Sequence, residues 1–248
     1  MNSLANIKTI TKRELGAYFS SPLAYVFIII FLLLCGFFTF MVGGFFELGQ
    51  ASLARPFFDW HPWFYLFLVP AVGMRLWAEE RRVGTLELLL TMPITPWQAI
   101  VGKFLASWFF LALALVLTFP IVITVNYLGN PDNGVIFATY IGSWLMAGAY
   151  LAVSCFTSAM TRTQVVSFIV SVVICLFLIL AGFPPVVRLF SGMVSPMIVD
   201  LITSFSVITH FEGFQKGILD SRDIIFFLSI IGFSLFSTSV ILRSHRAG

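Results

Sequence analysis

The sequence predicts an all-α integral membrane protein, and three observations lead to this fold class. Hydrophobic residues make up 59% of the 248-residue chain and charged residues only 10%, whereas about 25% of the residues in an ordinary soluble domain are charged. The apolar residues gather in runs that approach or exceed the roughly 20 residues of a membrane-spanning helix. Positive charges concentrate on alternate connections between these runs. We therefore expect six transmembrane helices in a single domain over residues 1–248.

The N-terminal segment predicts a helix over about residues 5–20 that lies along the cytoplasmic surface of the membrane. Apolar and charged residues interleave there, as in helices whose basic side chains face lipid headgroups. The charged residues are Lys8, Lys12, Arg13 and Glu14. A second interpretation stays open, in which these residues are only a positively charged topology signal.

Six apolar runs define the predicted spans. They cover about residues 23–42, 62–77, 97–125, 137–160, 165–183 and 224–242. Pro22 and Pro62 stand at span ends, where the missing N–H costs little. Pro70 and Pro120 fall inside spans, and we expect kinks there. Two shorter apolar stretches, near residues 186–194 and 197–209, predict short re-entrant or interfacial outer helices between the fifth and sixth spans.

The distribution of Lys and Arg gives the orientation. With a cytoplasmic N-terminus, ten of the 14 basic residues lie inside: Lys8, Lys12, Arg13, Arg75, Arg81, Arg82, Lys103, Arg162, Arg243 and Arg246. Four lie outside: Arg55, Arg188, Lys216 and Arg222. This bias satisfies the positive-inside rule and places both termini in the cytoplasm.

The first inside loop holds the densest cluster of charges in the chain. Residues 78–91 read AEERRVGTLELLLT, and apolar residues recur there at helical spacing. Glu79 and Arg82 are placed to pair at i, i+3. A short amphipathic helix here would suit a rigid handle for a cytosolic partner. An ordinary solvated loop explains the same charges, and the residues alone do not decide between the two.

The sequence carries no motif for chemistry of its own. It contains neither HExxH nor GxSxG, and it lacks the GxxxxGK[ST] loop that binds nucleotide phosphates. His210 and Glu212 lie near Asp200, but a zinc site needs three or four positioned ligands, so we predict no metal site and no catalytic residue. An intramembrane enzyme is therefore the weakest of the functional hypotheses.

Other functional classes are also disfavoured. Cys35, Cys155 and Cys175 each lie in an apolar run, where cysteine acts as a small buried hydrophobe. No basic cluster suits nucleic acid. Ionisable residues are nearly absent from the predicted spans, which argues against a proton- or sodium-coupled carrier. A translocation path through such spans would be apolar and would suit a lipid-like substrate or the transmission of force.

Four blocks of sequence resemble one known family. They are KRELGAYFSSPLAYV at 12–26, EERRVGTLELLLTMPI at 79–94, ITPWQAIVGKF at 94–104 and SFSVITHFEGFQKGILDSRDIIFF at 204–227. In order and spacing they are similar to the elbow helix, the coupling helix, the start of the third span and the segment before the sixth span of ABC-2 type transporter permeases. Within that family the chain resembles the gliding-motility-associated group.

The resemblance implies a half-transporter permease without enzymatic activity. In the family, the coupling helix enters a groove on a separate cytosolic ABC ATPase, which binds ATP and Mg²⁺. Here the contact residues would be Glu79, Glu80, Arg81, Arg82, Gly84, Thr85 and Glu87, with Gly84 allowing close backbone approach. The resemblance further implies pairing with a second permease copy, as a homodimer or a heterodimer, in the bacterial inner membrane.

A second functional hypothesis arises from the gliding-motility resemblance. In this alternative the chain is a membrane scaffold that links an ATPase to an envelope or motility machine without moving a solute. A periplasmic or membrane auxiliary subunit would then be a further partner. Both hypotheses assign the chain to the bilayer and assign the ATP chemistry to another protein.

Overall fold

The computed structural model describes residues 3–47, 49, 51–85, 94–191 and 195–244, and all its regular elements there are helical. The elements of the first half are α1 (Ser3–Phe19), α2 (Pro22–Phe37), its π-helical extension η1 (Phe38–Val42), the 3₁₀ turn η2 (Phe58–Trp60), α3 (His61–Gly73) and α4 (Arg75–Val83). Those of the second half are α6 (Pro96–Val116), α7 (Phe119–Leu128), α8 (Asn133–Met160), α9 (Gln164–Leu180), α10 (Pro184–Ser191), α11 (Pro196–Thr203), α12 (Val207–Gln215) and α13 (Ser221–Ser244).

Local sequence explains where several helices begin. Ser21 accepts a hydrogen bond from the N–H of Leu23, and Pro22 opens α2. Thr95 and Gln98 form a capping box at the start of α6, in which each side chain bonds to the other residue's backbone N–H. Asp132 accepts hydrogen bonds from the first N–H groups of α8. These caps satisfy N–H groups that no helical carbonyl can reach.

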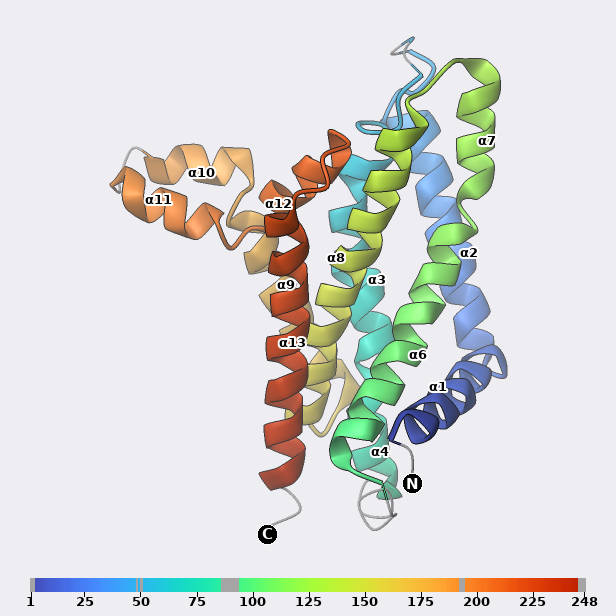
Figure 1. The fold of residues 1–248 in the computed structure, drawn as a ribbon, viewed down its shortest axis with the longest axis vertical. Helices are drawn as coiled ribbons and strands as arrows, with labels where there is room; N and C mark the ends of the chain where they lie inside the picture. Colours follow the sequence, from blue (N-terminus) through green and yellow to red (C-terminus); the bar gives the residue numbers. More distant parts are fainter. Residues whose placement is uncertain (1–2, 48, 50, 86–93, 192–194, 245–248) are drawn as a thin grey trace.

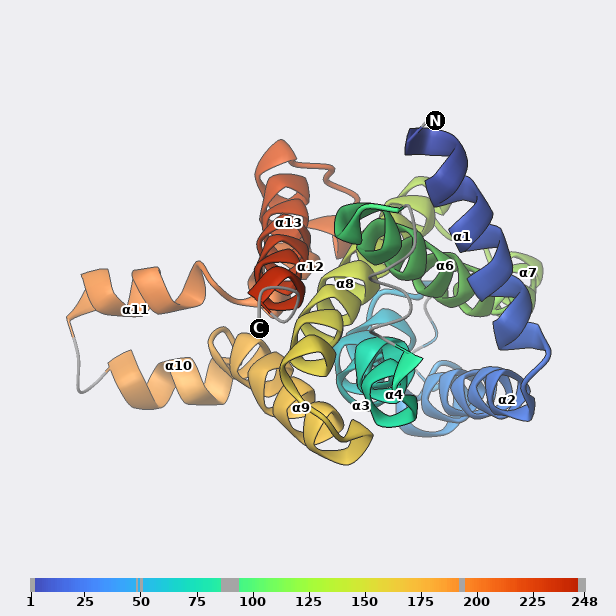
Figure 2. The ribbon, with the colours of Figure 1, turned by 90° about the horizontal axis from the view of Figure 1, so that it is seen from below.

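Helix α8 is the centre of the bundle. It packs against α3, α4, α6, α9, α12 and α13, and Figure 2 shows these helices arranged around it. Its buried face is rich in small residues, and Gly148 lies directly against the indole of Trp108. The Trp108 ring also stacks on Trp144, with ring centroids 4.2 Å apart. Small residues on a central helix let its neighbours approach closely, as is typical of helix packing in membranes.

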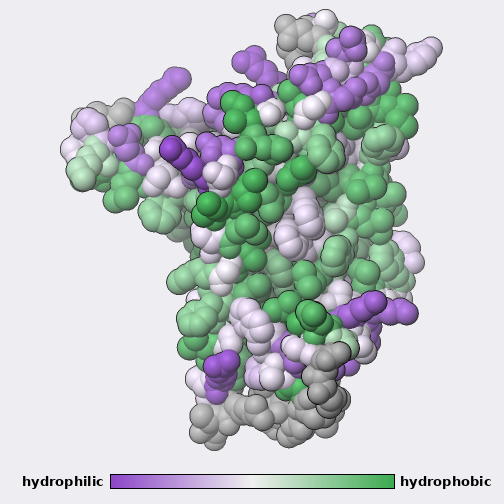
Figure 3. Space-filling model, viewed as in Figure 1, coloured by the Kyte–Doolittle hydropathy of each residue, from purple (hydrophilic) through white to green (hydrophobic). Residues whose placement is uncertain are grey.

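Four of the described helical segments are long and apolar enough to cross a membrane. They are Pro22–Val42, Pro96–Leu128, Asn133–Met160 and Ser221–Ser244, and the bent pair α11–α12 would add a fifth if it counted as one span. Hydrophobic residues cover the middle of the visible face, whereas hydrophilic residues gather toward its ends (Figure 3). The chain is therefore a multi-pass membrane protein. Because α3 has 13 residues and α9 has 17, the count of six spans stays a prediction.

The predicted helix positions agree well with the observed ones, with three informative differences. The expected third span is broken between α6 and α7, next to the expected kink at Pro120. Helix α3 continues through Pro70 and ends at Gly73. The outer segment holds three short helices where the sequence indicates two apolar stretches, and α11 and α12 meet at an angle of 68°.

The ends of the chain lie at one end of the bundle, and a side arm lies toward the other. Figure 1 shows the N- and C-termini at the same end, close to α4. The arm consists of α10 and α11, which pack on each other and project sideways from the bundle. The shared position of the termini agrees with an even number of crossings.

Candidate functional site

Most of the residues predicted to contact a partner lie on α4, at the end of the bundle that holds the termini (Figure 1). Glu79, Glu80, Arg81 and Arg82 form the last turns of this helix. The predicted pair of Glu79 and Arg82 is present, with 2.7 Å between Oε1 and the guanidinium. Glu87 lies outside the described residues. The basic residues near the C-terminus of α4 also interact favourably with the helix dipole.

Gly84 ends α4 because its backbone turns into the left-handed conformation. Its φ is 77°, in the left-handed region, and its N–H bonds back to the carbonyls of Glu80 and Arg81. Glycine adopts this conformation without steric cost, and such a residue is a common helix stop. Among the described residues, no atom lies within 4 Å of the position that a Cβ would take. Within the chain, Gly84 therefore serves the turn rather than a close contact, and the helix expected over 78–91 is interrupted there.

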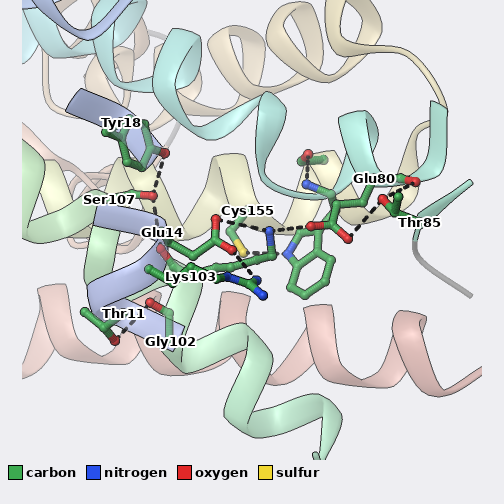
Figure 4. A network of polar contacts seen from close by, with 12 residues as sticks. Thr11, Glu14, Tyr18, Glu80, Thr85, Gly102, Lys103, Ser107 and Cys155 are labelled. Carbon is green, nitrogen blue, oxygen red and sulfur yellow. Dashed lines mark hydrogen bonds and ion pairs between the residues drawn. The ribbon is translucent and has the colours of Figure 1, made fainter. Parts of the chain in front are cut away.

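A single buried lysine joins α4 to two other helices. Lys103 on α6 has 5% of its side chain exposed, and its Nζ lies 2.7 Å from Glu80 Oε1 and 3.5 Å from Glu14 Oε2 (Figure 4). Glu14 is on α1 and Glu80 is on α4, so the ammonium bridges three helices. The Trp77 ring lies 5.6 Å from the same ammonium. A lysine buried this deeply needs such partners, because an unpaired charge away from water is costly.

The other face of α4 is attached to the end of α8. The N–H groups of Trp77 and Ala78 both donate to Ser158 Oγ, each at 3.0 Å. The Trp77 indole N–H donates to Cys155 Sγ at 3.2 Å. Arg81 donates to the carbonyl of Ala159, in the last turn of α8. Burial, together with the nearby charge of Arg162, lowers the pKa of Arg81, and the partly negative end of α8 offsets some of that cost.

Helix α1 is fixed to α6 along its length. Thr11 donates to the carbonyl of Gly102 at 3.2 Å, and the hydroxyls of Tyr18 and Ser107 lie 2.8 Å apart. Burial raises the pKa of Tyr18 to about 12, so its hydroxyl stays protonated in this contact. The exposed face carries Lys8 and Lys12. The helix is thus amphipathic, as predicted.

The predicted contact residues divide into two sets. Glu80 and Arg81 face inward, toward Lys103 and the end of α8. Arg82, Gly84 and Thr85 are exposed, and the Arg82 side chain is 66% exposed. Glu14, predicted only as one of the charged residues of the interfacial helix, reaches Lys103, and it also pairs with the exposed Arg13 at 2.7 Å. One set is available to another molecule, and the other connects α4 to the bundle.

Sequence reasoning missed Lys103, Trp77 and Ser158 as parts of this site. Lys103 was counted only as an inside charge, although it falls seven residues into a predicted span. An ionisable residue at such a depth points to a function by default, and this signal could have found it. Nothing in the sequence singles out Ser158, since its role depends on two backbone N–H groups that lie 81 and 80 residues earlier in the chain.

The outer end contains one histidine contact. His210 Nδ1 lies 2.7 Å from Asp223 Oδ1, and Nε2 lies 3.0 Å from the carbonyl oxygen of Ser204. Both ring nitrogens are engaged, and the ring stacks on Phe226. Within the described ranges, no three His, Cys, Asp or Glu side chains are grouped closely enough to hold a metal ion. This contact ties α12 to α13.

Comparison with known proteins adds one finding. A family model described as "ABC-2 family transporter protein" matches residues 63–230, which is more than half of the chain. The match begins in α3 and ends in α13, so it includes α4 and Lys103 and excludes α1 and α2. No curated protein matches the chain with significant similarity.

Proposed function

The chain belongs to the ABC-2 family of transporter proteins, and on this premise we propose that it is the permease subunit that couples a cytosolic ABC ATPase to the membrane bundle. The ATPase would be a separate protein that binds ATP and Mg²⁺. The chain itself would contribute no catalytic residue. Six spans, with both termini in the cytoplasm of a bacterium, would place α4 on the side where the ATPase is found.

One observation carries the coupling role. The exposed end of α4 continues directly into the buried contacts with Lys103 and Ser158. A displacement of Arg82 or Thr85 by a bound protein would therefore be transmitted to α1, α6 and α8 together. Packed helices move as units between discrete arrangements rather than bending continuously. We therefore assign Arg82, Gly84, Thr85 and the neighbouring Glu79 to contact with the ATPase. Glu80 and Arg81 would transmit its movement, and α1 would act as the elbow helix.

The finer features of the assembly follow the same proposal. Two copies would pair as a homodimer in the inner membrane and drive export of a substrate or mechanical work. The gliding-motility-associated group remains the subgroup that the sequence resembles most. The largely apolar spans suit a lipid-like substrate better than a strongly hydrated one.

The exposed arm gives a reason to retain the scaffold hypothesis as a second candidate. Leu189 on α10 is 71% exposed, and Met197 on α11 is 83% exposed. Apolar side chains on a projecting hairpin suit a membrane or protein neighbour. A complex that binds and stimulates the ATPase but moves no solute would favour this candidate.

The coupling proposal is tested by co-purifying an ABC ATPase of the same organism with this chain. The variant Glu79→Ala/Arg82→Ala is expected to lower ATPase recovery and its stimulation by about tenfold, because two charged contacts are lost at the interface. The matched control is Glu212→Ala/Lys216→Ala, which removes an exposed i, i+4 pair on α12. Equal recovery of the ATPase with the wild type, the test variant and the control variant would contradict the proposal.

Native mass spectrometry of the same complex tests whether the permease is a dimer. One permease copy per assembly would count against a dimer.

A further inference from the structure

A cavity of about 480 Å³ lies beside the Lys103 contacts, between α1, α2, α3, α4 and α6. This volume falls in the range of known small-molecule sites, roughly 300–1,000 Å³. The lining has two parts. Apolar side chains of α2 and α3 form the inner part, and charged side chains of α1, α4 and α6 form the mouth.

The inner part of the cavity suits a hydrocarbon chain. Val26 and Ile30 on α2 face Leu68 and Ala71 on α3 across the space. Val26 is 51% exposed and Ile30 is 43% exposed, although both lie in a segment that is long and apolar enough to cross the membrane. In a bilayer, exposed surface at this position meets acyl chains rather than water. The slot therefore has an apolar lining that lipid tails can reach.

The charged residues of the mouth are three carboxylates and two cations, and the neighbouring Arg13 and Arg82, which pair with two of the carboxylates, bring the whole cluster to one more positive than negative charge. Its three carboxylates each have a cationic partner: Glu14 pairs with Arg13 and Lys103, Glu79 with Arg82, and Glu80 with Lys103. Arg75, the first residue of α4, also lines the mouth. It is exposed, and no ion pair or hydrogen bond joins its guanidinium to any described residue. The surplus charge is thus located on Arg75.

We propose that this cavity binds one anionic lipid of the cytoplasmic leaflet, with an acyl chain between α2 and α3 and its phosphate on Arg75. The guanidinium is planar and presents a fork of N–H donors that matches a phosphate. The depth of the apolar slot next to this single free cation distinguishes a lipid from a free phosphate ion, which would leave the slot empty. A phospholipid with net charge −1 balances the cluster formed by the mouth together with Arg13 and Arg82, and a zwitterionic one does not.

This binding site stands apart from the coupling role. It requires the arrangement of α1 to α6 but neither an ATPase nor transport. A lipid held there would contact both α1 and α4, so it would also stabilise the helices that the coupling proposal uses. Binding is therefore measured on the chain without nucleotide, and its failure would leave the coupling proposal intact.

The test measures lipid retention by the full chain in detergent with native mass spectrometry. The probes are dioleoyl phosphatidylglycerol, dioleoyl phosphatidylcholine and glycerol phosphate. We expect phosphatidylglycerol to remain bound, phosphatidylcholine to be retained about fivefold less and glycerol phosphate to be absent. Arg75→Gln is expected to lower phosphatidylglycerol retention about fivefold, as loss of one charge-assisted contact at a partly exposed site predicts. Ala71→Phe, which fills the slot, is expected to abolish retention.

Two control variants separate this site from general effects. Arg222→Gln removes an exposed cation at the start of α13, and Val173→Phe adds bulk on α9, where Val173 is 44% exposed. Both are expected to retain phosphatidylglycerol as the wild type does. A phosphatidylglycerol with a photoreactive acyl chain should label peptides of α2 and α3. Equal retention of both phospholipids, unchanged retention by Arg75→Gln, or labelling spread evenly over α9 and α13 would overturn the proposal. Thermal midpoints verify that each variant is folded.

Discussion

Lys103 is the residue on which the candidate site depends most. Its ammonium has exchanged water for two carboxylates that are themselves partly shielded, with side-chain exposures of 18% for Glu80 and 20% for Glu14. Taking the charges out of water offsets much of their mutual attraction. The contact therefore contributes less to net stability than its geometry suggests. The contact instead specifies which three helices meet and how they are aligned with one another.

Removing the lysine should be more harmful than removing the whole contact. We expect Lys103→Met to lower stability by about 2–3 kcal/mol, because Glu80 and Glu14 lose their shared cation. The double variant Lys103→Met/Glu80→Gln should recover part of this loss, since it leaves one fewer unpaired charge. Thermal unfolding in detergent measures both. A double variant less stable than Lys103→Met would contradict this account.

The partners of Lys103 show why this part of the site could not be predicted. Glu80 is 23 residues away in sequence and Glu14 is 89 residues away. The sequence shows that all three residues are charged and that charges cluster in the segment after Ala78. Composition and periodicity contain no information on which charges approach each other across helices. Only the local pair, Glu79 with Arg82, follows from helical spacing.

At the scale of elements, the packing of α1 on α6 leaves no room for a larger residue at position 102. A methyl group on Gly102 would lie 2.7 Å from Ile10 Cγ2 and 2.9 Å from Ile10 Cβ. A β-branched side chain in a helix has little freedom to move aside. The two helix backbones can therefore approach this closely only because residue 102 is glycine. The same contact places Thr11, Glu14 and Tyr18 within reach of α6.

Two glycine substitutions test this packing as a matched pair. Gly102→Ala should destabilise the protein by about 1–3 kcal/mol, because the added methyl group forces α1 away from α6. Gly16→Ala, within α1 itself, meets no atom within 4 Å, and it should stabilise that helix by about 0.5–1 kcal/mol. Thermal midpoints in one detergent compare the two. A Gly102→Ala midpoint equal to or above that of the wild type would show that the approach is looser than described.

Elements were easier to predict than contacts because their signals are local. Apolar runs and Pro22 fix several helix starts to within a few residues. The end of α4 was placed too late, because the apolar spacing continues past residue 84 while the backbone turns at that glycine. The sequence predicts only two of the three short outer helices, because the apolar stretch over 197–209 continues across the break between α11 and α12.

For the whole molecule, the distribution of charge and the positions of the termini point to one orientation. Arg243 lies in the last turn of α13, near the C-terminus, and α4 ends at the same end of the bundle. Arg222 begins α13 at the opposite end. These two arginines thus lie at opposite ends of the bundle, and the predicted orientation places Arg243 inside and Arg222 outside. The hydrophobic surface between the two ends is the part that a bilayer would cover (Figure 3).

Cysteine labelling tests this orientation with little background. The native Cys35, Cys155 and Cys175 are all buried and free, so a membrane-impermeant maleimide should react mainly with introduced cysteines. In intact cells with a permeable outer membrane, Tyr127→Cys and Lys216→Cys should be labelled. Lys8→Cys and Ser244→Cys should react only after the inner membrane is opened. Labelling of Lys8→Cys and Ser244→Cys on opposite sides would exclude an even number of crossings.

The three-helix contact at Lys103 also bears on how the chain is made. Protein synthesis runs from the N-terminus, so Glu14 and Glu80 both leave the ribosome before Lys103 does. When the segment carrying the lysine reaches the bilayer, α1 and α4 already supply the two carboxylates that compensate its charge. A chain that lost either helix would present an uncompensated ammonium to the insertion machinery, and its third apolar segment would enter the membrane less readily. The contact would thus make insertion of the third apolar segment depend on the two earlier helices that supply its carboxylates.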